Sequence, residues 1–319
     1  MNEDDLAKAA PNPIALVGDD IESWRDGLRT ALPREQFVEL AAMSPAQRAA
    51  ARIAIVTNPA AAELDRLPQL EWVHSLWAGV DQLIEVAQQR GFSLTRLVDP
   101  ALAATMAEAT LAWSLYLSRY MPEYREQQSR ALWQELPYRP AADWRVSVLG
   151  TGELGLASAR RLQDNGFRVS AWGRTPKQHA DLHCVSGLPA LDQLLSQSDI
   201  AICLLPLTPA TRGLLNAERL AMLAPSAALI NFARGPIVVD ADLIRALKNA
   251  RLRHAVLDVF DEEPLAQDNE LWRLKNVTVL PHVSAPTPPA SATKIVAQNI
   301  TTYRATQTLP DLVDLEIGY

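Results

Sequence analysis

The amino-acid sequence predicts an α/β protein with two doubly wound parallel sheets and a cleft between the two domains. Its 319 residues correspond to two domains of roughly 150 residues each. Hydrophobic residues make up 48% of the chain and charged residues 21%, which is ordinary for a globular protein. Short apolar runs alternate with stretches of helical periodicity, and this alternation is typical of βαβ units on a parallel sheet.

The larger domain is predicted in the second half of the chain, where helix-like stretches separate six apolar runs. These candidate strands are residues 145–149, 168–172, 199–205, 227–232, 254–259 and 277–280. Runs without polar alternation are buried on both faces, so we expect helices on both sides of this sheet.

A smaller α/β domain is predicted before it, on apolar runs at 14–18, 52–57 and 93–98. Residues 101–133 lack glycine and should form a long helix or two joined helices, with Pro122 as the expected break.

The end of the chain is predicted to return to the smaller domain. Prolines in residues 284–289 exclude regular structure, and a last helix is expected at about 291–306. We therefore divide the chain into residues 1–99, completed by 288–319, and residues 100–287.

The charge balance argues against nucleic acid as a partner. Lys and Arg total 30 against 37 for Asp and Glu, a net charge of −7, and no basic run is present. Apolar stretches fall short of the roughly 20 residues that span a bilayer, and residues 1–5 are acidic where a signal peptide is basic. Cys184 and Cys203 fit core thiols of a reducing compartment. We expect a cytoplasmic protein that binds neither membrane nor nucleic acid.

A glycine motif follows the first strand of the larger domain. Gly150-Thr151-Gly152-Glu153-Leu154-Gly155 fits G-x-G-x-x-G and opens a predicted helix at residues 154–165. Such glycines allow a tight turn, close approach of a pyrophosphate and close helix–sheet packing, while the helix N-terminus favours negative charge. The position between strand and helix indicates dinucleotide binding. The expected cofactor contacts here are Gly150, Gly152, Glu153, Leu154 and Gly155.

The end of the second strand predicts which dinucleotide is bound. An NAD-binding chain usually places Asp or Glu there, against the ribose 2′-hydroxyl. This chain has Gly173, followed by Arg174, Thr175 and Lys177. Two cations and a hydroxyl suit a 2′-phosphate, so NADP(H) is the expected cofactor, with NAD(H) as the alternative.

Three reactive side chains follow later strands. Arg234, Glu263 and His282 come shortly after the runs ending at 232, 259 and 280. Because ligands bind outside the carboxyl ends of parallel strands, all three should reach the edge that carries the glycine motif. A guanidinium can bind a carboxylate and polarise a carbonyl, and a histidine held by a carboxylate can donate a proton. The set favours carbonyl reduction, although each residue alone would also suit a turn or a surface ion pair.

These residues lie in motifs through which the chain resembles the D-isomer-specific 2-hydroxyacid dehydrogenases, and among them the glyoxylate/hydroxypyruvate reductase branch. Besides the glycine motif, they are N-F-A-R-G at 231–235, L-D-V-F at 257–260, E-P-L at 263–265 and P-H at 281–282. The spacings of 29 residues from Arg234 to Glu263 and 19 from Glu263 to His282 also match. The resemblance covers nearly the whole chain and implies two Rossmann-like or flavodoxin-like domains, with the dinucleotide at residues 100–287 and the substrate at 1–99.

The resemblance also implies residue roles. Arg234 would bind and polarise the 2-oxoacid, His282 would be the acid or base, and Glu263 would support His282. Asp258 would contact the nicotinamide carboxamide. Leu205, Pro206 and Ala233 complete the expected cofactor contacts.

Two further segments carry the resemblance. The run W-A-G-V-D at 77–81 is similar to a loop whose backbone N–H groups hold the substrate carboxylate. Trp77, Ala78 and Gly79 are therefore expected at the substrate, with Arg234 and His282. Trp133 resembles a tryptophan that reaches the partner subunit's substrate pocket, which implies a homodimer.

The leading interpretation is NADPH-dependent reduction of a small 2-oxoacid, from glyoxylate to glycolate or from hydroxypyruvate to D-glycerate. The alternatives are an NAD-linked dehydrogenase for a bulkier 2-hydroxyacid and a dinucleotide-sensing protein of the corepressor type. Pocket shape decides between acids, and the sequence does not encode it. His179 and His183 are spaced like a zinc pair but lack a third ligand, so no metal site is expected.

Overall fold

The computed structural model describes residues 12–176 and 179–319, which belong to two compact units. Unit 1 comprises Met1–Asp99 and Thr287–Tyr319, and unit 2 comprises Pro100–Pro286. Each unit contains one parallel sheet, so the predicted α/β class with two parallel sheets is confirmed. Within the described residues, no helix is both long and apolar enough to cross a bilayer.

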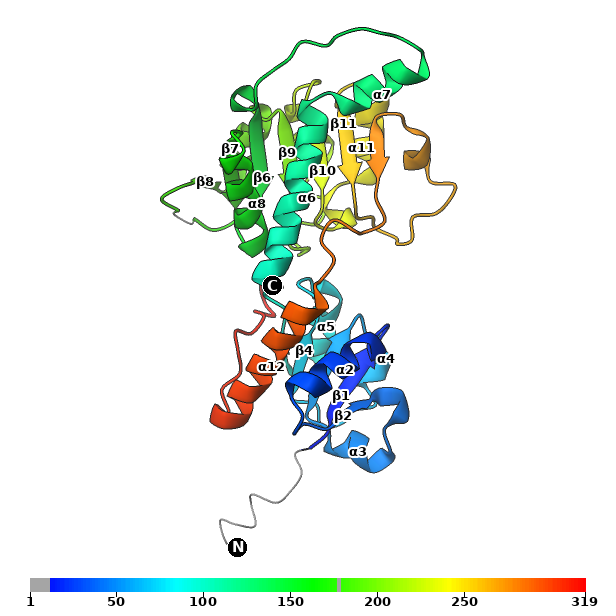
Figure 1. Ribbon diagram of the computed structural model, residues 1–319, viewed down its shortest axis with the longest axis vertical. Helices are drawn as coiled ribbons and strands as arrows, with labels where there is room; N and C mark the ends of the chain where they lie inside the picture. The colour runs from blue at the N-terminus through cyan, green and yellow to red at the C-terminus, as the bar shows by residue number, and fades with distance from the viewer. Residues whose placement is uncertain (1–11, 177–178) are drawn as a thin grey trace, which may run out of the picture. The chain divides into compact units, whose positions relative to one another are not determined.

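Unit 2 is built on a seven-stranded parallel sheet in the order β12-β11-β10-β9-β6-β7-β8 (Figure 1). Its strands are β6 (Arg145–Leu149), β7 (Arg168–Gly173), β8 (His183–Ser186), β9 (Ile200–Cys203), β10 (Ala228–Asn231), β11 (His254–Leu257) and β12 (Val277–Val279). The strand order reverses between β6 and β9, which is the arrangement of a Rossmann fold. Ligands bind at such a reversal, outside the carboxyl ends of the strands.

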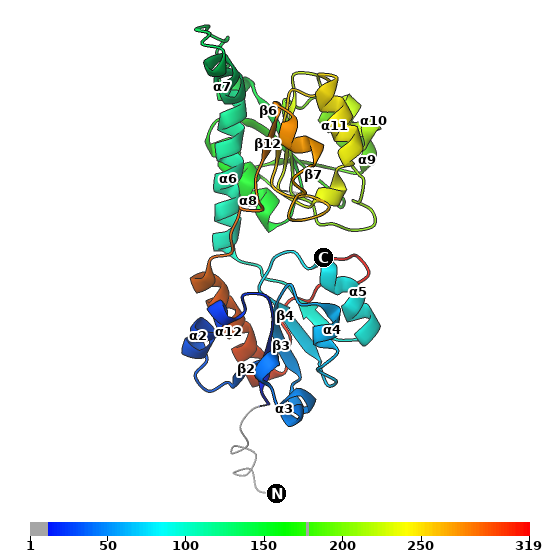
Figure 2. The same ribbon diagram turned by 90° about the vertical axis from the view of Figure 1, so that its right-hand side faces the viewer.

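Helices cover both faces of this sheet (Figure 2). One face is covered by α6 (Pro100–Ser118) and α8 (Glu153–Asp164), and the other by α9 (Leu188–Ser196), α10 (Ala217–Met222) and α11 (Asp240–Lys248). Alternate residues of the central strand β9 pack into the two cores: Ile200 and Ile202 join one, and Cys203 joins the other. Burial of Cys203 raises the pKa of its thiol to about 12.

Unit 1 contains a five-stranded parallel sheet in the order β2-β1-β3-β4-β5, as in flavodoxin-like folds. Its strands are β1 (Ile14–Gly18), β2 (Phe37–Glu39), β3 (Ile53–Thr57), β4 (Trp72–Ser75) and β5 (Ser93–Thr95). Helices α2 (Glu22–Ala31) and α12 (Pro289–Thr306) cover one face, and α4 (Ala61–Leu64) and α5 (Asp81–Arg90) cover the other (Figure 2). The short helix α3 (Pro45–Ala50) precedes β3.

Three strands of the structure do not correspond to any predicted apolar run. β2 has only three residues, and the edge strand β8 is partly exposed and begins with a polar residue. β4 has the sequence W-V-H-S, in which the fully buried His74 interrupts the apolar run. A strand that is short or partly exposed, or that contains a buried polar residue, lacks the continuous apolar run on which the prediction depends.

The predicted helical region consists of two joined helices, and the break between them lies just before Pro122 and not at the proline itself. α6 ends at Ser118, and the turn is made by Tyr120, whose φ of 57° is left-handed. Pro122 instead lies in the first turn of α7 (Met121–Ser129), where its missing N–H is not needed for the helix. Trp133 lies beyond α7, outside regular structure.

Candidate active site

The glycine motif forms the turn from β6 into α8, beside the reversal of strand order. Gly150 has a φ of +130°, and a Cβ there would lie 2.6 Å from the carbonyl oxygen of Leu204, which follows β9. A Cβ on Gly155 would lie 2.0 Å from the carbonyl oxygen of Gly150. Both positions therefore exclude any side chain for reasons within the fold.

Gly152 differs from both. Apart from Gly152 and the residues next to it in the chain, no heavy atom of the described residues contacts the position its Cβ would take, although Gly152 is the N-cap of α8. The open space thus lies at the N-terminus of a twelve-residue helix, where backbone N–H groups favour a negatively charged group. This cradle fits the pyrophosphate of a dinucleotide.

The residues expected at a 2′-phosphate follow β7. Arg174 and Thr175 are exposed directly after the last residue of this strand, Gly173. Lys177 lies outside the described residues. β7 pairs with β6, so Arg174 and Thr175 are at the edge of the sheet that carries the glycine motif.

Arg234 is held in place by the residues on either side of it. The side chain of buried Asn231, the last residue of β10, donates to the carbonyl of Arg234 at 3.1 Å and accepts from the N–H of Ala233 at 3.2 Å. A Cβ on Gly235 would lie 2.0 Å from the carbonyl carbon of Phe260. The backbone of the Arg234 turn therefore packs directly against the loop after β11.

Glu263 and His282 form a direct pair. Oε2 of Glu263 lies 2.8 Å from Nδ1 of His282, and Oε1 accepts the N–H of Phe260 at 2.9 Å. Because a carboxylate accepts hydrogen bonds, Nδ1 carries the proton in this contact, and Nε2 faces away from Glu263. The His282 side chain is 52% exposed, so the ring is not enclosed by the residues of its own loop.

Asp258, which is predicted to contact the nicotinamide, also holds the backbone around His282 through hydrogen bonds. Its carbonyl accepts the N–H of His282 at 3.0 Å, and its two carboxylate oxygens accept the N–H groups of Val283 and Ser284 at 2.8 Å each. His282 has a left-handed φ of 55°, which is uncommon for a residue with a side chain. Three hydrogen bonds to the 2% exposed Asp258 hold this conformation.

The structure places the predicted residues in two groups. Those of unit 2 lie after the carboxyl ends of parallel strands, including Leu205, Pro206 and Ala233 after β9 and β10. Trp77, Ala78 and Gly79 lie in unit 1 after β4, half-buried, with the N–H of Trp77 bonded to Oγ of Ser75. Their contact with substrate stays a prediction.

Sequence reasoning missed the positioning roles of Asn231, Gly235 and Phe260. A polar residue at the end of an otherwise apolar strand was an available signal for Asn231. The close approach of Gly235 to Phe260 depends on the pairing of β10 with β11, which the sequence does not display. The bond from the N–H of Phe260 to Glu263 is local, but it depends on the path of the loop after β11.

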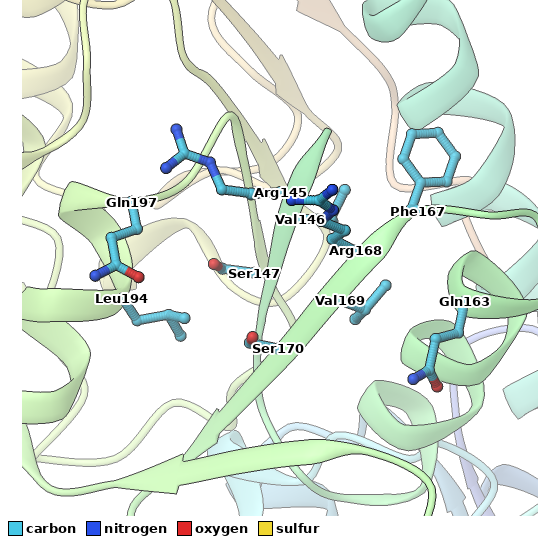
Figure 3. A pocket seen from close by; sticks show the side chains of 10 residues that line it. All are labelled: Arg145, Val146, Ser147, Gln163, Phe167, Arg168, Val169, Ser170, Leu194 and Gln197. Atoms are coloured by element: carbon cyan, nitrogen blue, oxygen red, sulfur yellow. The ribbon is translucent and has the colours of Figure 1, made fainter. Parts of the chain in front are cut away.

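Two other features lie apart from this edge. A pocket at the amino ends of β6 and β7 is lined by residues such as Arg145, Ser147 and Arg168 (Figure 3), and the glycine motif lies at the opposite ends of these strands. Nδ1 of His183 contacts Oγ of Ser170 at 3.2 Å. In residues 12–176 and 179–319, no group of three or more His, Cys, Asp and Glu side chains is placed to hold a metal ion.

Comparison with known proteins gives a consistent result. The sequence profile of the D-isomer specific 2-hydroxyacid dehydrogenase NAD-binding domain matches residues 111–284. A glyoxylate/hydroxypyruvate reductase A from Serratia proteamaculans is 37% identical over 306 residues, which cover 93% of this chain and 96% of that protein.

Solved structures agree over almost the full length. A D-isomer specific 2-hydroxyacid dehydrogenase from Xanthobacter autotrophicus, in complex with NADPH and MES, has a TM-score of 0.91 at 37% identity and covers 97% of this chain and 100% of its own. An NADPH-dependent glyoxylate/hydroxypyruvate reductase from Sinorhizobium meliloti, in complex with NADP and sulfate, has a TM-score of 0.89 at 31% identity, with coverages of 97% and 100%.

Proposed function

This chain belongs to the D-isomer specific 2-hydroxyacid dehydrogenases, a family of oxidoreductases, and we propose that it reduces a small 2-oxoacid with NADPH. Glyoxylate and hydroxypyruvate are the proposed substrates. The observation that carries the proposal is the 2.8 Å pair of Glu263 and His282, at the sheet edge that also bears Arg234 and the glycine motif. The names of the similar proteins from Serratia and Sinorhizobium support it.

The cofactor would be held by residues of unit 2. The N-terminus of α8 around Gly152 suits the pyrophosphate, and Arg174 and Thr175 suit a 2′-phosphate, because a guanidinium and a hydroxyl both donate to phosphate oxygens. The absence of a carboxylate at Gly173 removes the usual partner of a free 2′-hydroxyl. When bound, NADPH supplies a hydride for the carbonyl carbon of the substrate.

His282 supplies the proton that reduction requires. Addition of a hydride to a carbonyl carbon leaves an alkoxide, and transfer of the proton from Nε2 of His282 to that oxygen gives the hydroxyl. Oε2 of Glu263 accepts a hydrogen bond from Nδ1–H at 2.8 Å, which fixes the orientation of the ring. Asp258 holds the backbone on which the ring is mounted.

Arg234 binds the substrate. Its guanidinium stays charged, so it suits the carboxylate of a 2-oxoacid and polarises the neighbouring carbonyl, but it cannot serve as the proton donor. Asn231 and Gly235 fix the backbone from which Arg234 extends. The resemblance adds backbone N–H groups of Ala78 and Gly79 as carboxylate ligands, which makes unit 1 the substrate domain and unit 2 the dinucleotide domain.

A homodimer is part of the proposal. Beyond α7 the chain forms a long loop on unit 2 (Figure 1), in which Trp133 is 99% exposed and Tyr138 70% exposed. Burial of one tryptophan removes roughly 200 Å² from water, so exposure of this size favours a protein partner. A second copy of the chain is the partner that the family resemblance implies. A cytoplasmic location remains a prediction of the composition.

The proposal is tested by steady-state oxidation of NADPH and NADH at 340 nm with glyoxylate, hydroxypyruvate, pyruvate and a bulky 2-oxoacid. We expect the highest kcat/KM with NADPH and one of the first two acids. A higher value with NADH and the bulky acid would support the NAD-linked alternative. Tight NADPH binding without turnover of any acid would support the sensing protein instead.

A further inference from the structure

Residues 119–139 form an arm on unit 2, which comprises α7 and the loop that follows it (Figure 1). The N-terminal and C-terminal halves of the arm contact each other at three levels, which pair Arg119 with Tyr138, Tyr124 with Leu136, and Gln127 with Leu132. The guanidinium carbon of Arg119 lies 5.3 Å from the centre of the Tyr138 ring, and hydrogen bonds of 3.1 Å and 2.9 Å make the other two levels. The arm is therefore closed by its own contacts, although its second half contains no helix or strand.

A largely buried guanidinium fixes the first half of the arm at its base. Arg253 directly precedes β11, and its side chain is only 15% exposed. Its Nη1 donates to Oε1 of Glu123 on α7 at 3.0 Å and to the carbonyl of Leu117 in the last turn of α6 at 3.2 Å. Its guanidinium carbon lies 5.6 Å from the centre of the Tyr120 ring and 5.5 Å from that of Trp144. One cation thus joins the end of α6, the start of α7 and the residue before β6.

Stacking on aromatic rings explains an otherwise unfavourable feature of Arg253. Its Nε and Nη2 atoms are buried and have no hydrogen-bond acceptor among the described residues. A guanidinium compensates for this through contact with the faces of aromatic rings, whereas a lysine ammonium has no flat surface to pack against them. The contacts with Tyr120 and Trp144 therefore favour arginine over lysine at this position.

The second half of the arm returns to the same tryptophan. The guanidinium carbon of Arg139 lies 4.5 Å from the centre of the Trp144 ring, and its Nη2 donates to Oδ2 of Asp199 at 2.8 Å. Trp144, Asp199 and Arg253 directly precede β6, β9 and β11, so the base of the arm stands at the amino ends of parallel strands. The glycine motif and His282 follow the carboxyl ends of strands. The base of the arm is therefore separate from the candidate active site.

The fixed base determines how the arm presents its apolar side chains. Trp133 is almost fully exposed, and Leu132 and Tyr138 are also exposed. An arm that is already fixed loses less conformational entropy on association than a free loop, because its backbone is ordered before the partner binds. We propose that Arg253, together with Trp144, is a positioning residue for subunit association, which holds the arm so that Trp133 meets a second copy of the chain. This inference rests on the proposed homodimer.

Analytical sedimentation measures the effect on association. Arg253→Met keeps an unbranched side chain but removes the charge, the bond to Glu123 and the flat group that packs on the rings. We expect it to raise the dissociation constant of the dimer at least about tenfold, and Arg253→Lys to raise it less, because the ammonium can still pair with Glu123. Arg251→Met, at an exposed position two residues earlier in the chain, is the matched control and should leave the constant unchanged.

Limited digestion with trypsin measures how firmly the arm is held in the absence of a partner. The Trp133→Ala background is used because this variant should be monomeric, so that no partner protects the arm. Cleavage after Arg130, which is exposed in the arm, should become at least about fivefold faster when Arg253→Met is added, because a detached arm opens more often. Arg251→Met should not change this rate. Unchanged cleavage with Arg253→Met, or an unchanged dissociation constant of the dimer, would overturn the inference.

Further outcomes separate the inference from the proposed function. A lower Tm without faster cleavage of the folded protein would show a merely structural role and contradict the proposal. If Arg253→Met fails to fold, Glu123→Gln decides, because it removes the same ion pair from the side of the arm and should raise both the dissociation constant and the cleavage rate. If the wild type is itself a monomer, the homodimer fails and with it the role in association, while faster cleavage would still show that Arg253 fixes the arm.

Discussion

The loop that carries His282 depends on a single buried carboxylate. Asp258 accepts two backbone N–H groups with its side chain and a third with its carbonyl. Asp258→Asn replaces one accepting oxygen with an NH₂ group that faces a backbone donor, so one bond is lost and a buried donor is left unsatisfied.

We expect Asp258→Asn to lower the free energy of unfolding by roughly 1–3 kcal/mol and kcat by about tenfold or more, because His282 is no longer fixed. Urea unfolding and steady-state kinetics measure the two effects. Asp268→Asn, at an exposed position of unit 2, is the control and should change neither. Unchanged kcat in a folded Asp258→Asn variant would refute the positioning role.

His74 gives the protein a pH-dependent stability. Burial lowers the pKa of His74 to about 4, against an ordinary value of 6.5. Nδ1 lies 2.9 Å from the carbonyl of Ser75, and Nε2 lies 2.9 Å from the amide nitrogen of Asn299 on α12. The neutral ring, with its proton on Nδ1, satisfies both contacts.

Between pH 6.5 and 4 the unfolded chain binds a proton at His74 that the folded chain does not. Stability is therefore fully present above pH 6.5 and falls as the pH is lowered, by about 2 kcal/mol at pH 5. Urea unfolding at pH 7.5 and 5 should show a smaller loss in His74→Gln than in the wild type. Part of the loss of stability should remain in the variant, because burial also lowers the pKa of His254 to about 4 and its stabilising effect falls over the same pH range. Identical losses in the two proteins would count against this assignment.

At the residue scale, the sequence could locate the reactive side chains but not their contacts. Arg234, Glu263 and His282 follow predicted strands, and parallel strands bring their carboxyl ends to one edge. The three bonds to Asp258 join the segments that follow two different strands, β11 and β12. Such contacts depend on three-dimensional loop paths, which hydrophobic patterning does not determine.

At the element scale, the glycines in the turn into α8 are expected to differ in role: one is needed for folding and another for cofactor binding. Gly155→Ala places a Cβ 2.0 Å from a backbone oxygen, so it should destabilise the protein strongly. Gly152→Ala meets open space at the helix N-terminus, so it should leave Tm nearly unchanged and weaken NADPH binding. Thermal unfolding and fluorescence titration measure both. Tight NADPH binding by Gly152→Ala would show that no phosphate approaches that point.

The elements that the sequence predicted well are the long apolar strands, because continuous burial leaves a clear pattern. The short strand β2, the partly exposed edge strand β8 and the histidine-containing β4 leave none. The break after α6 was predicted two residues too late: Tyr120 adopts a left-handed conformation that propensity does not predict, while Pro122 is compatible with the first turn of α7.

At the scale of the whole molecule, the exposed loop after α7 predicts self-association. Sedimentation at micromolar concentration should give a species of twice the 35.0 kDa chain mass. Trp133→Ala should shift the equilibrium toward monomer, because it removes the most exposed tryptophan of the described residues. Trp272→Ala, at a position 51% exposed beyond β11, is the control and should not. A 35.0 kDa species at all concentrations would exclude the dimer.

If this protein is a reductase in which His282 donates the proton, His282→Ala should abolish most of its activity. The variant should fold, bind NADPH within about twofold of the wild type, and lose about 10²-fold or more in kcat with glyoxylate or hydroxypyruvate. Because Glu263 is still present in this variant, the loss of kcat would also show that its carboxylate cannot replace the imidazole as the proton donor. Near-normal turnover in a folded, NADPH-bound His282→Ala variant would contradict the mechanism.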